Sequence, residues 1–324
     1  MEAKHTNITT TKPIVQRCFT PAKILHNSQE VTLPSGFCKY LVEITNTRLF
    51  AVGDTEGNVT FWDSDTLKHI YTLTLHKGWI NHMLYLKENR LLITTSTDQA
   101  ICVYNLPQDL SQSTKKGEME SNWILHLLDL EEEGLFGSCS ECCVKLWDIE
   151  TLKLVEEIRS YACHYWQYVK KMKCIFFAHD DGTIALYDMR KKKWQRSVPL
   201  FNQNMSCSTF SLVEYVEKIN MLITIVQGER IIIWKLCQQR IHYIKKIPIM
   251  DLSNSVPCLA AGKYLLGSDG EGKIYAYNAL SGKVLREIDL GIEPLMWLFL
   301  KNECKIIVPD IISNKIYVLK YGCV

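Results

Sequence analysis

The sequence lacks a strong charge imbalance, a long apolar run and the short motifs that mark common enzymes. Its 324 residues carry a formal net charge of +2, which predicts no general affinity for nucleic acid or anionic membranes. No apolar stretch approaches the roughly 20 residues that a membrane-spanning helix needs, so we expect no membrane partner. The first residues contain no apolar signal core, which predicts a cytoplasmic protein, with a nuclear location also open. Without a phosphate loop, nucleophile elbow or metal signature, we expect neither an enzyme nor a cofactor binder.

The 13 cysteines form no regular framework. They are scattered, odd in number and mostly placed in runs that predict strands, such as Cys102, Cys174 and Cys258. Small apolar thiols of this kind are typical of a reducing compartment. We therefore expect reduced cysteines rather than a set of disulfides.

One local group of cysteines could in principle bind zinc. Cys139, Cys142 and Cys143 are followed downstream by Cys163 and His164, and four such ligands can surround zinc as a tetrahedron. However, Cys139 is expected on a strand and the next two in the following turn, where they face different directions. A second CxxC or HxxxH pair is missing. The sequence therefore favours no metal here and leaves zinc as an alternative.

What the chain does contain is a repeated pattern. A turn, a β-rich triplet and an aromatic residue followed by an acidic or polar one first occur as Glu56-Gly57-Asn58, Val59-Thr60-Phe61 and Trp62-Asp63. The pattern returns at spacings of 42, 43, 40, 47, 43 and 42 residues. The seven aromatic pairs, of which the last is the weakest, are Trp62-Asp63, Tyr104-Asn105, Trp147-Asp148, Tyr187-Asp188, Trp234-Lys235, Tyr277-Asn278 and Leu319-Lys320.

Each unit predicts short antiparallel strands, because apolar and polar residues alternate between tight turns. A sheet of this size cannot bury its own apolar face, so the units must pack against one another. Apolar residues make up 47% of the chain, which is enough for a sizeable shared core.

In period and register these units resemble the WD-repeat family, from about Gly36 to Tyr321. The resemblance implies an all-β fold, a seven-bladed β-propeller of four-stranded antiparallel blades. We expect a flexible polar tail at residues 1–20 and one propeller domain at residues 21–324. No room for a fourth strand remains after Tyr321, so we predict that an N-terminal strand completes the last blade and closes the ring.

The aromatic pairs also place the first strand of each blade. We expect these strands to begin 25 residues before the aromatic residue, with one start displaced by a residue. The expected starts are Phe37, Trp79, Trp123, Thr209, Leu252 and Pro294. Residues 107–121 form a long polar stretch, which we predict to be an exposed loop, with disorder favoured over phosphorylation-dependent regulation.

In WD-repeat proteins, a loop His, a turn Asp, a strand Ser or Thr and the Trp of the aromatic pair form a hydrogen-bonded structural network. The second repeat approaches it, with His76, Asp98 and either Thr94 or Ser96. Tyr104 replaces the Trp and Leu75 replaces the usual Gly before the His, so we predict an incomplete network here and none elsewhere. A structural role for His76 and Asp98 is favoured over acid–base catalysis, because no nucleophile or second carboxylate lies beside them.

A basic run, Arg190 to Arg196, follows the fourth aromatic pair. It could contact phosphates and stack a base on Trp194, but a solvated turn is favoured, and we predict no other nucleic-acid site. Tyr187-Asp188-Met189-Arg190 resembles the WDxR box of WD-repeat substrate receptors on cullin-type ubiquitin ligases, with Tyr in place of Trp. The resemblance implies an adaptor-binding role for Tyr187, Asp188 and Arg190.

Aromatic residues gather where first strands are expected to begin. The loops before these strands open on one face of a propeller, and Tyr and Trp are enriched in interface hot spots. Trp79 and Trp123 recur at one repeat position, so we expect them to pack between blades. Tyr161, Tyr165 and Trp166 break the repeat pattern, so we predict protein binding for them, with packing as the alternative.

These features favour a non-catalytic scaffold that binds other proteins within a larger complex. The alternative is a substrate receptor of a cullin-type ubiquitin ligase that acts through residues 187–190. An enzyme is disfavoured. Residues 274–288 and the adjacent cysteines Cys142 and Cys143 resemble quinone-cofactor propeller dehydrogenases, but those enzymes have eight blades and a Trp-rich docking motif.

Overall fold

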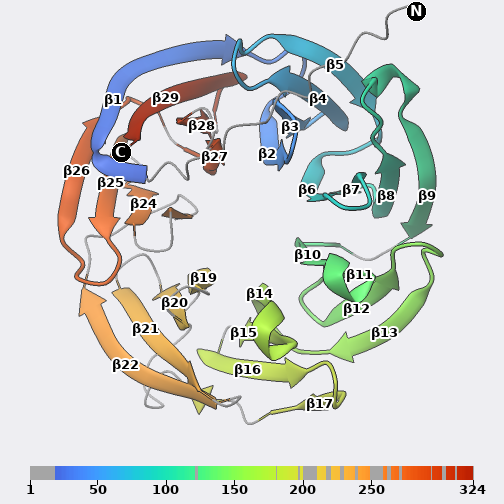
Figure 1. Cartoon of the computed structure of the whole chain (residues 1–324), viewed down its shortest axis with the longest axis vertical. Helices are drawn as coiled ribbons and strands as arrows, with labels where there is room; N and C mark the ends of the chain where they lie inside the picture. Colours follow the sequence, from blue (N-terminus) through green and yellow to red (C-terminus); the bar gives the residue numbers. More distant parts are fainter. Residues whose placement is uncertain are drawn as a thin grey trace, which may run out of the picture.

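The computed structural model describes residues 19–120, 123–179, 181–195, 198–199, 210–216, 220–226, 230–237, 240–248, 258–260, 264–269, 272–292, 294–300, 304–310 and 312–323. Within them, strands form seven antiparallel sheets, arranged as blades around one axis (Figure 1). The helices of this part are three 3-10 turns, η1 (Leu110–Gln112), η2 (Glu131–Glu133) and η3 (Lys170–Met172). In the residues described, no helix is long and apolar enough to cross a membrane.

The first four blades follow one another along the chain, each from its inner strand outwards. Blade 1 consists of β2 (Cys38–Ile44), β3 (Leu49–Asp54), β4 (Asn58–Asp63) and β5 (His69–Thr74). Blade 2 consists of β6 (Ile80–Leu86), β7 (Leu91–Ser96), β8 (Ala100–Asn105) and β9 (Thr114–Glu120). Blade 3 consists of β10 (His126–Leu130), β11 (Leu135–Cys139), β12 (Cys143–Asp148) and β13 (Leu154–Arg159). Blade 4 consists of β14 (Cys163–Val169), β15 (Cys174–His179), β16 (Thr183–Asp188) and β17 (Lys193–Trp194), with β18 (Val198–Pro199) also paired to β16.

The remaining three blades complete the ring. Blade 5 consists of β19 (Phe210–Val216), β20 (Met221–Val226), β21 (Arg230–Cys237) and β22 (Arg240–Pro248). Blade 6 consists of β23 (Cys258–Ala260), β24 (Tyr264–Ser268), β25 (Lys273–Asn278) and β26 (Val284–Asp289). Blade 7 consists of β27 (Leu298–Leu300), β28 (Lys305–Pro309), β29 (Lys315–Cys323) and β1 (Phe19–Thr32). The predicted seven-bladed propeller is thereby confirmed.

The core lies between the blades. Each of seven clusters of buried apolar residues joins two neighbouring blades. One cluster, for example, combines Leu146 of blade 3 with Phe177 of blade 4, and another combines Val52 of blade 1 with Ile307 of blade 7. Burial of these surfaces stabilises a blade only when its neighbours are present, at roughly 25 cal/mol per Å² of apolar area.

The second residue of an aromatic pair shapes the turn after the third strand. Asp63 Oδ1 accepts the backbone N–H of Thr66 at 2.6 Å and its hydroxyl at 2.8 Å. Asp148 Oδ1 accepts the same two groups of Thr151, both at 2.7 Å. The Thr66 backbone N–H holds the pKa of Asp63 below its usual value. The acidic position therefore recurs because a carboxylate closes this turn.

The predicted ring closure is confirmed. Strand β1 pairs antiparallel with β29, with Leu25 opposite Lys320 and Thr32 opposite Lys315. Figure 1 shows β1 following the outer side of β29 near the C-terminus. The predicted tail lies outside the described residues up to residue 18, and its last two positions, 19 and 20, already belong to β1.

The prediction of an exposed loop at residues 107–121 is wrong. Residues 110–112 form η1, and β9 pairs with β8 as the outer strand of blade 2. An outer strand has one solvated face and needs few apolar side chains. Its sequence is therefore as polar as that of a loop. Neighbouring side chains of β9 point to opposite faces. Glu118 is exposed, whereas Met119 packs against the core cluster between blades 2 and 3.

Three first strands begin one residue after the expected position, at Cys38, Ile80 and Phe210. Two begin later than expected: β10 starts at His126 instead of near Trp123, and β27 starts at Leu298, although Pro294 forms an isolated bridge with Asp310. Strand β23 begins at Cys258, and the expected start at Leu252 lies outside the described residues. The period along the chain is therefore regular for the third strands and less regular for the first.

The buried side chain of Lys305 links blade 7 to blade 1 by hydrogen bonds. Lys305 is 6% exposed, and its Nζ donates to the backbone carbonyls of Ser64 at 2.8 Å and Asp65 at 2.7 Å. Lys305→Met keeps the apolar stem but leaves these carbonyls without their donor. We expect the free energy of unfolding to fall by about 2 kcal/mol in urea titrations. Lys320→Met, at an exposed position of β29, is the matched control. Equal stability of the two variants would contradict this assignment.

Candidate protein-binding site

Four large aromatic side chains lie exposed just before the inner strands of blades 1 to 4. They are Phe37, Trp79, Trp123 and Tyr161, exposed by 45%, 52%, 62% and 57%. The inner strands β2, β6, β10 and β14 contact one another in this order. Because the blades repeat around one axis, the starts of these strands lie on the same side of the ring. We call this side, defined by the four residues, the aromatic face.

The backbones of Phe37 and Trp79 are held in the same way. The N–H of Phe37 donates to Thr55 Oγ1 at 3.0 Å, and the N–H of Trp79 donates to Thr97 Oγ1 at 2.9 Å. Each threonine N–H bonds back to the aromatic residue's carbonyl at 3.0 Å. A Cβ on Gly78 would stand 2.3 Å from Thr97 Oγ1, so only glycine permits this approach. These bonds fix the backbone, and both rings stay largely exposed to solvent.

Two of the four rings have further contacts that limit their motion. Lys39 Nζ of blade 1 lies 4.6 Å from the centre of the Trp79 ring, a cation–π contact between neighbouring blades. The Tyr161 ring stacks on His179 at 4.5 Å, with 3° between the planes. Its hydroxyl donates to Asp181 Oδ2 at 3.0 Å. Fixed rings lose little conformational entropy when a partner binds.

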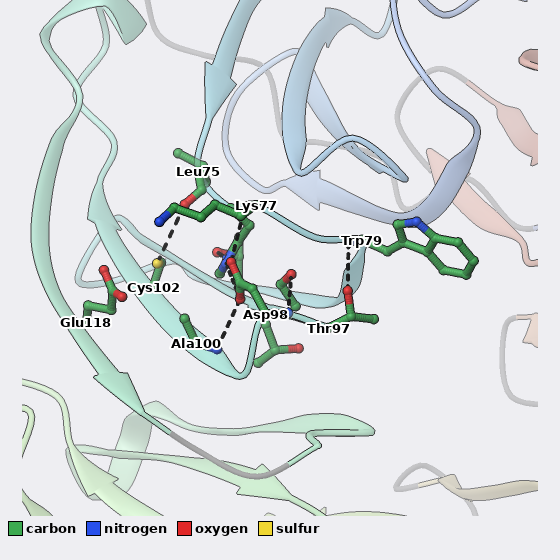
Figure 2. Close-up of polar contacts among 12 residues, drawn as sticks. Leu75, Lys77, Trp79, Thr97, Asp98, Ala100, Cys102 and Glu118 are labelled. Carbon is green, nitrogen blue, oxygen red and sulfur yellow. Dashed lines mark hydrogen bonds and ion pairs between the residues drawn. The ribbon is translucent and has the colours of Figure 1, made fainter.

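A hydrogen-bonded network lies behind Trp79. His76 Nδ1 lies 3.1 Å from both carboxylate oxygens of Asp98, and His76 Nε2 lies 2.9 Å from Thr94 Oγ1. Asp98 also accepts the backbone N–H groups of Lys77 at 2.9 Å and Ala100 at 3.1 Å (Figure 2). Figure 2 shows Trp79 on the opposite side of this network from Cys102 and Glu118.

His76 is neutral in this network. Burial lowers its pKa below the usual value and outweighs the opposite effect of Asp98. Burial would raise the pKa of Asp98, but the Lys77 N–H and His76 bring it below the usual value. Neutral His76 therefore donates from Nδ1 to the Asp98 carboxylate and accepts the Thr94 hydroxyl at Nε2. This is a structural hydrogen-bond chain with no nucleophile in it.

The network is more complete than the sequence predicted. Leu75 stands in place of the usual glycine, and the backbone bonds of this loop are still made. The N–H groups of Leu75 and His76 both donate to the Gly57 carbonyl at 3.1 Å. Among the described residues, blades 1, 3 and 5 have the bond from the indole of the aromatic pair to a strand hydroxyl. Its distances are 2.9 Å from Trp62 to Thr60, 2.8 Å from Trp147 to Ser138 and 3.1 Å from Trp234 to Thr224.

Removal of the Asp98 carboxylate tests this network. Asp98→Ala leaves His76 and the N–H groups of Lys77 and Ala100 without their acceptor. We expect a loss of about 2–4 kcal/mol in the free energy of unfolding, measured by urea denaturation. Glu88→Ala, at an exposed surface position, serves as the control and should change stability by less than about 0.5 kcal/mol. A similar small change for Asp98→Ala would show that the network does not stabilise blade 2.

The structure divides the predicted aromatic group. Tyr161 lies on the aromatic face, but Trp166 is only 4% exposed, and Tyr165 packs against the core between blades 4 and 5. Tyr165 and Trp166 therefore do not share an exposed surface with Tyr161, because both lie within β14 and not in the loop before it. The expected packing of Trp79 and Trp123 between blades is also wrong, since both precede their strands and project into solvent.

Sequence reasoning missed Phe37 as a surface residue and treated it only as a strand start. The signal was present in the doublets Gly36-Phe37 and Gly78-Trp79, which recur at the same position of two blades. A glycine before the aromatic residue marks the close approach of this loop to the threonine of the next turn.

The predicted adaptor box lies on the opposite face. Its residues close the turn after β16, a third strand, which leads away from the aromatic face. Tyr187 is buried and its hydroxyl donates to Glu156, while Asp188 accepts the N–H groups of Arg190 at 3.0 Å and Lys191 at 3.1 Å. Arg190 is exposed. The basic run is described only as far as Gln195, and both the adaptor and the nucleic-acid roles stay predictions.

The cysteine group lies between blades 3 and 4. Cys139, Cys143 and Cys163 are buried, whereas Cys142 is exposed. Burial, with a smaller effect of Cys163, raises the pKa of the Cys139 thiol well above its usual value. Among the residues that the structure describes, no set of three or more His, Cys, Asp or Glu could hold a metal ion. Cys304 is disulfide-bonded, so the expectation of reduced cysteines is wrong at this residue. It is confirmed at Cys38, Cys102, Cys139, Cys142, Cys143, Cys163 and Cys174, which are free.

Comparisons with known proteins agree with the propeller fold. The family model described as WD domain, G-beta repeat, matches residues 67–105, which include the first three strands of blade 2. The WD repeat-containing protein 55 homolog of Drosophila ananassae is 33% identical over 66 residues, covering 20% of this chain and 14% of the relative. The homolog of Drosophila virilis is 37% identical over 65 residues, covering 20% of this chain and 13% of the relative. These matches therefore span a small part of each relative.

A solved structure matches nearly the whole chain. The β-propeller domain of Cps50 (Swd1) from Myceliophteria thermophila superposes with a TM-score of 0.76 and covers 93% of this chain and 99% of that domain. At 13% identity, this likeness shows the fold alone. With a WD40 repeat matched at residues 67–105 and seven blades in one closed ring, the chain is a seven-bladed β-propeller that is similar to WD-repeat proteins in its second blade.

Proposed function

We propose that this propeller is a non-catalytic scaffold that binds a protein partner on its aromatic face. The observation that carries the proposal is the exposure of Phe37, Trp79, Trp123 and Tyr161 at the same place in four consecutive blades. Isolated exposed apolar residues are ordinary, but a set on one face marks an interaction surface. Tyr and Trp are also the residue types that dominate binding energy at protein interfaces.

The chemistry of this face favours a partner that supplies apolar side chains between polar groups. The four rings offer flat apolar area, while Lys39 and Asp181 beside them can form hydrogen bonds at the edge of the interface. The backbone bonds of Phe37 and Trp79 hold the loops in place before binding. Such an interface suits a stable complex with other subunits.

The test is affinity purification of the tagged full chain from its native cell, followed by mass spectrometry. We expect a reproducible set of co-purifying proteins at near-stoichiometric amounts. Recovery of the chain alone, under mild salt, would contradict the scaffold proposal. An adaptor and a cullin in the recovered set, lost on Arg190→Ala, would instead support the receptor role through residues 187–190.

A further inference from the structure

Two basic loops of blade 4 meet on the face opposite to the aromatic face. One is η3 with its capping residue, which carries Lys170, Lys171 and Lys173 between β14 and β15. The other is the turn after β16, residues 190–193, which consists of an arginine and three lysines. The N–H of Met189 donates to the Lys173 carbonyl at 3.1 Å, so the two loops lie side by side. We call these seven basic residues the basic patch.

The sequence shows only one part of the basic patch as a run. Residues 170–173 are separated from residues 190–193 by the strands β15 and β16, and the fold places the two groups together. Six of the seven basic residues are exposed, and Lys173 is half-buried. The patch therefore concentrates positive charge on one blade, which the net charge of +2 for the whole chain does not reveal.

Carboxylates neutralise only part of the basic patch. Four of its cations form ion pairs, which are Lys170–Glu132, Lys173–Glu133, Lys191–Asp188 and Lys192–Glu156. The side chains of these four lysines are 35% to 65% exposed. Exposed ion pairs contribute little to stability, so a phosphate can replace a carboxylate at small cost. Among the residues that the structure describes, no carboxylate pairs with Lys171, Arg190 or Lys193.

Trp194 provides a flat aromatic side chain beside the basic patch. It lies on β17 next to Lys193 and opposite Tyr187 of β16. Its ring centre is 5.4 Å from that of Tyr187 and 4.7 Å from that of Phe177, and both of these residues are buried. The two contacts hold the indole in place, while Trp194 stays 43% exposed. A fixed and partly exposed indole can stack on one base of a nucleic acid strand.

We infer that blade 4 binds single-stranded nucleic acid, with phosphates on the basic patch and a base stacked on Trp194. Phosphates are spaced along a strand and so match cations that are spread over two loops. An acidic protein segment would use the same cations but would not need the exposed indole. A double helix keeps its bases stacked inside and would leave Trp194 unused. The inference goes beyond the scaffold proposal and does not depend on it.

The experiment is fluorescence anisotropy of the full chain with labelled oligothymidylate and oligouridylate of about 12 nucleotides, which separates DNA from RNA. We expect saturable binding of one or both strands at about 50 mM salt. The affinity should fall as salt rises, with a slope near −2 in a double-logarithmic plot if about three phosphates are bound. Trp194→Leu should weaken binding roughly tenfold, because the stacking surface is lost.

A triple variant tests the cations that have no carboxylate partner. Lys171→Ala, Arg190→Ala and Lys193→Ala together should weaken binding roughly tenfold or more and flatten the salt dependence. The matched control is the triple alanine variant of Lys68, Lys87 and Lys283, which are exposed in turns of blades 1, 2 and 6 on the same face. It changes the net charge equally and should bind as the wild type does. Circular dichroism checks that each variant is folded.

Absence of saturable binding of both strands would overturn the inference. So would equal losses in the two triple variants, or unchanged affinity in Trp194→Leu. If Trp194→Leu does not fold, the two triple variants decide the result. Tighter binding of a duplex of the same length would contradict the single-stranded assignment. Equal displacement of the strand by a glutamate peptide of similar charge would show that the patch binds acidic protein segments instead. None of these results depends on whether a protein partner is found by affinity purification.

Discussion

Deletion of residues 1–33 should abolish or severely weaken cooperative unfolding of the whole propeller. The deletion removes β1, which pairs with β29 along the outer edge of blade 7. It also removes Leu33, a buried member of the core between blades 7 and 1. A propeller gains stability from closure, because an open blade exposes unpaired strand groups and apolar area together. We expect a melting temperature lower by roughly 10 °C or more, measured by circular dichroism.

A shorter deletion controls for the loss of chain length. Removal of residues 2–17 ends before β1 begins at Phe19 and should leave the melting temperature nearly unchanged. If removal of residues 1–33 also left it unchanged, β1 would not be needed to close the ring. A selective loss of blade 7 alone, with a second transition for the rest, would show that closure stabilises only the last blade.

Replacement of Trp79 and Trp123 by alanine should remove most of the partner recovered by affinity purification. The two side chains are 52% and 62% exposed, so their removal leaves the core intact while it deletes the largest flat areas of the aromatic face. Truncation of a hot-spot tryptophan costs about 2 kcal/mol or more, which corresponds to a loss of affinity of roughly 30-fold for each residue. The dissociation constant of the purified complex, measured by surface plasmon resonance, gives this number.

Tyr243→Ala supplies a matched control. Tyr243 is 59% exposed, as much as the two tryptophans, but it lies on β22, the outer strand of blade 5. We expect its removal to leave the affinity within about a factor of two. Equal losses for Tyr243→Ala and the double variant would show that the effect comes from general surface hydrophobicity. Unchanged binding by the double variant would remove the aromatic face from the proposal.

The fold could be predicted because its signals are local and repeated. The pair Trp62-Asp63 marks the end of a third strand, and the carboxylate closes the next turn onto Thr66. The same arrangement at Trp147-Asp148 makes the period visible without any knowledge of the core. The need for closure followed from a count of strands, since the last repeat supplies three, β27, β28 and β29, to a four-stranded blade.

The candidate site could be predicted only in part, because exposure depends on where a residue lies relative to its strand. Trp79 and Trp166 are the same residue type near the starts of inner strands. One precedes β6 and points into solvent, whereas the other lies inside β14 and faces its neighbours. A difference of a few residues in where the strand begins reverses the burial. The outer strand β9 was missed for a related reason, because its solvated face carries the composition of a loop.

The central claim is that a partner covers the aromatic face, and hydrogen–deuterium exchange of the purified complex tests it most directly. Compared with the free chain, we expect slower exchange in peptides that cover residues 36–39, 77–80 and 160–163, the loops that carry Phe37, Trp79 and Tyr161. Blades 5 and 6 should exchange equally in both states. Protection confined to residues 187–192, the turn after β16 on the opposite face, would contradict the claim and favour binding through the box at Tyr187–Arg190.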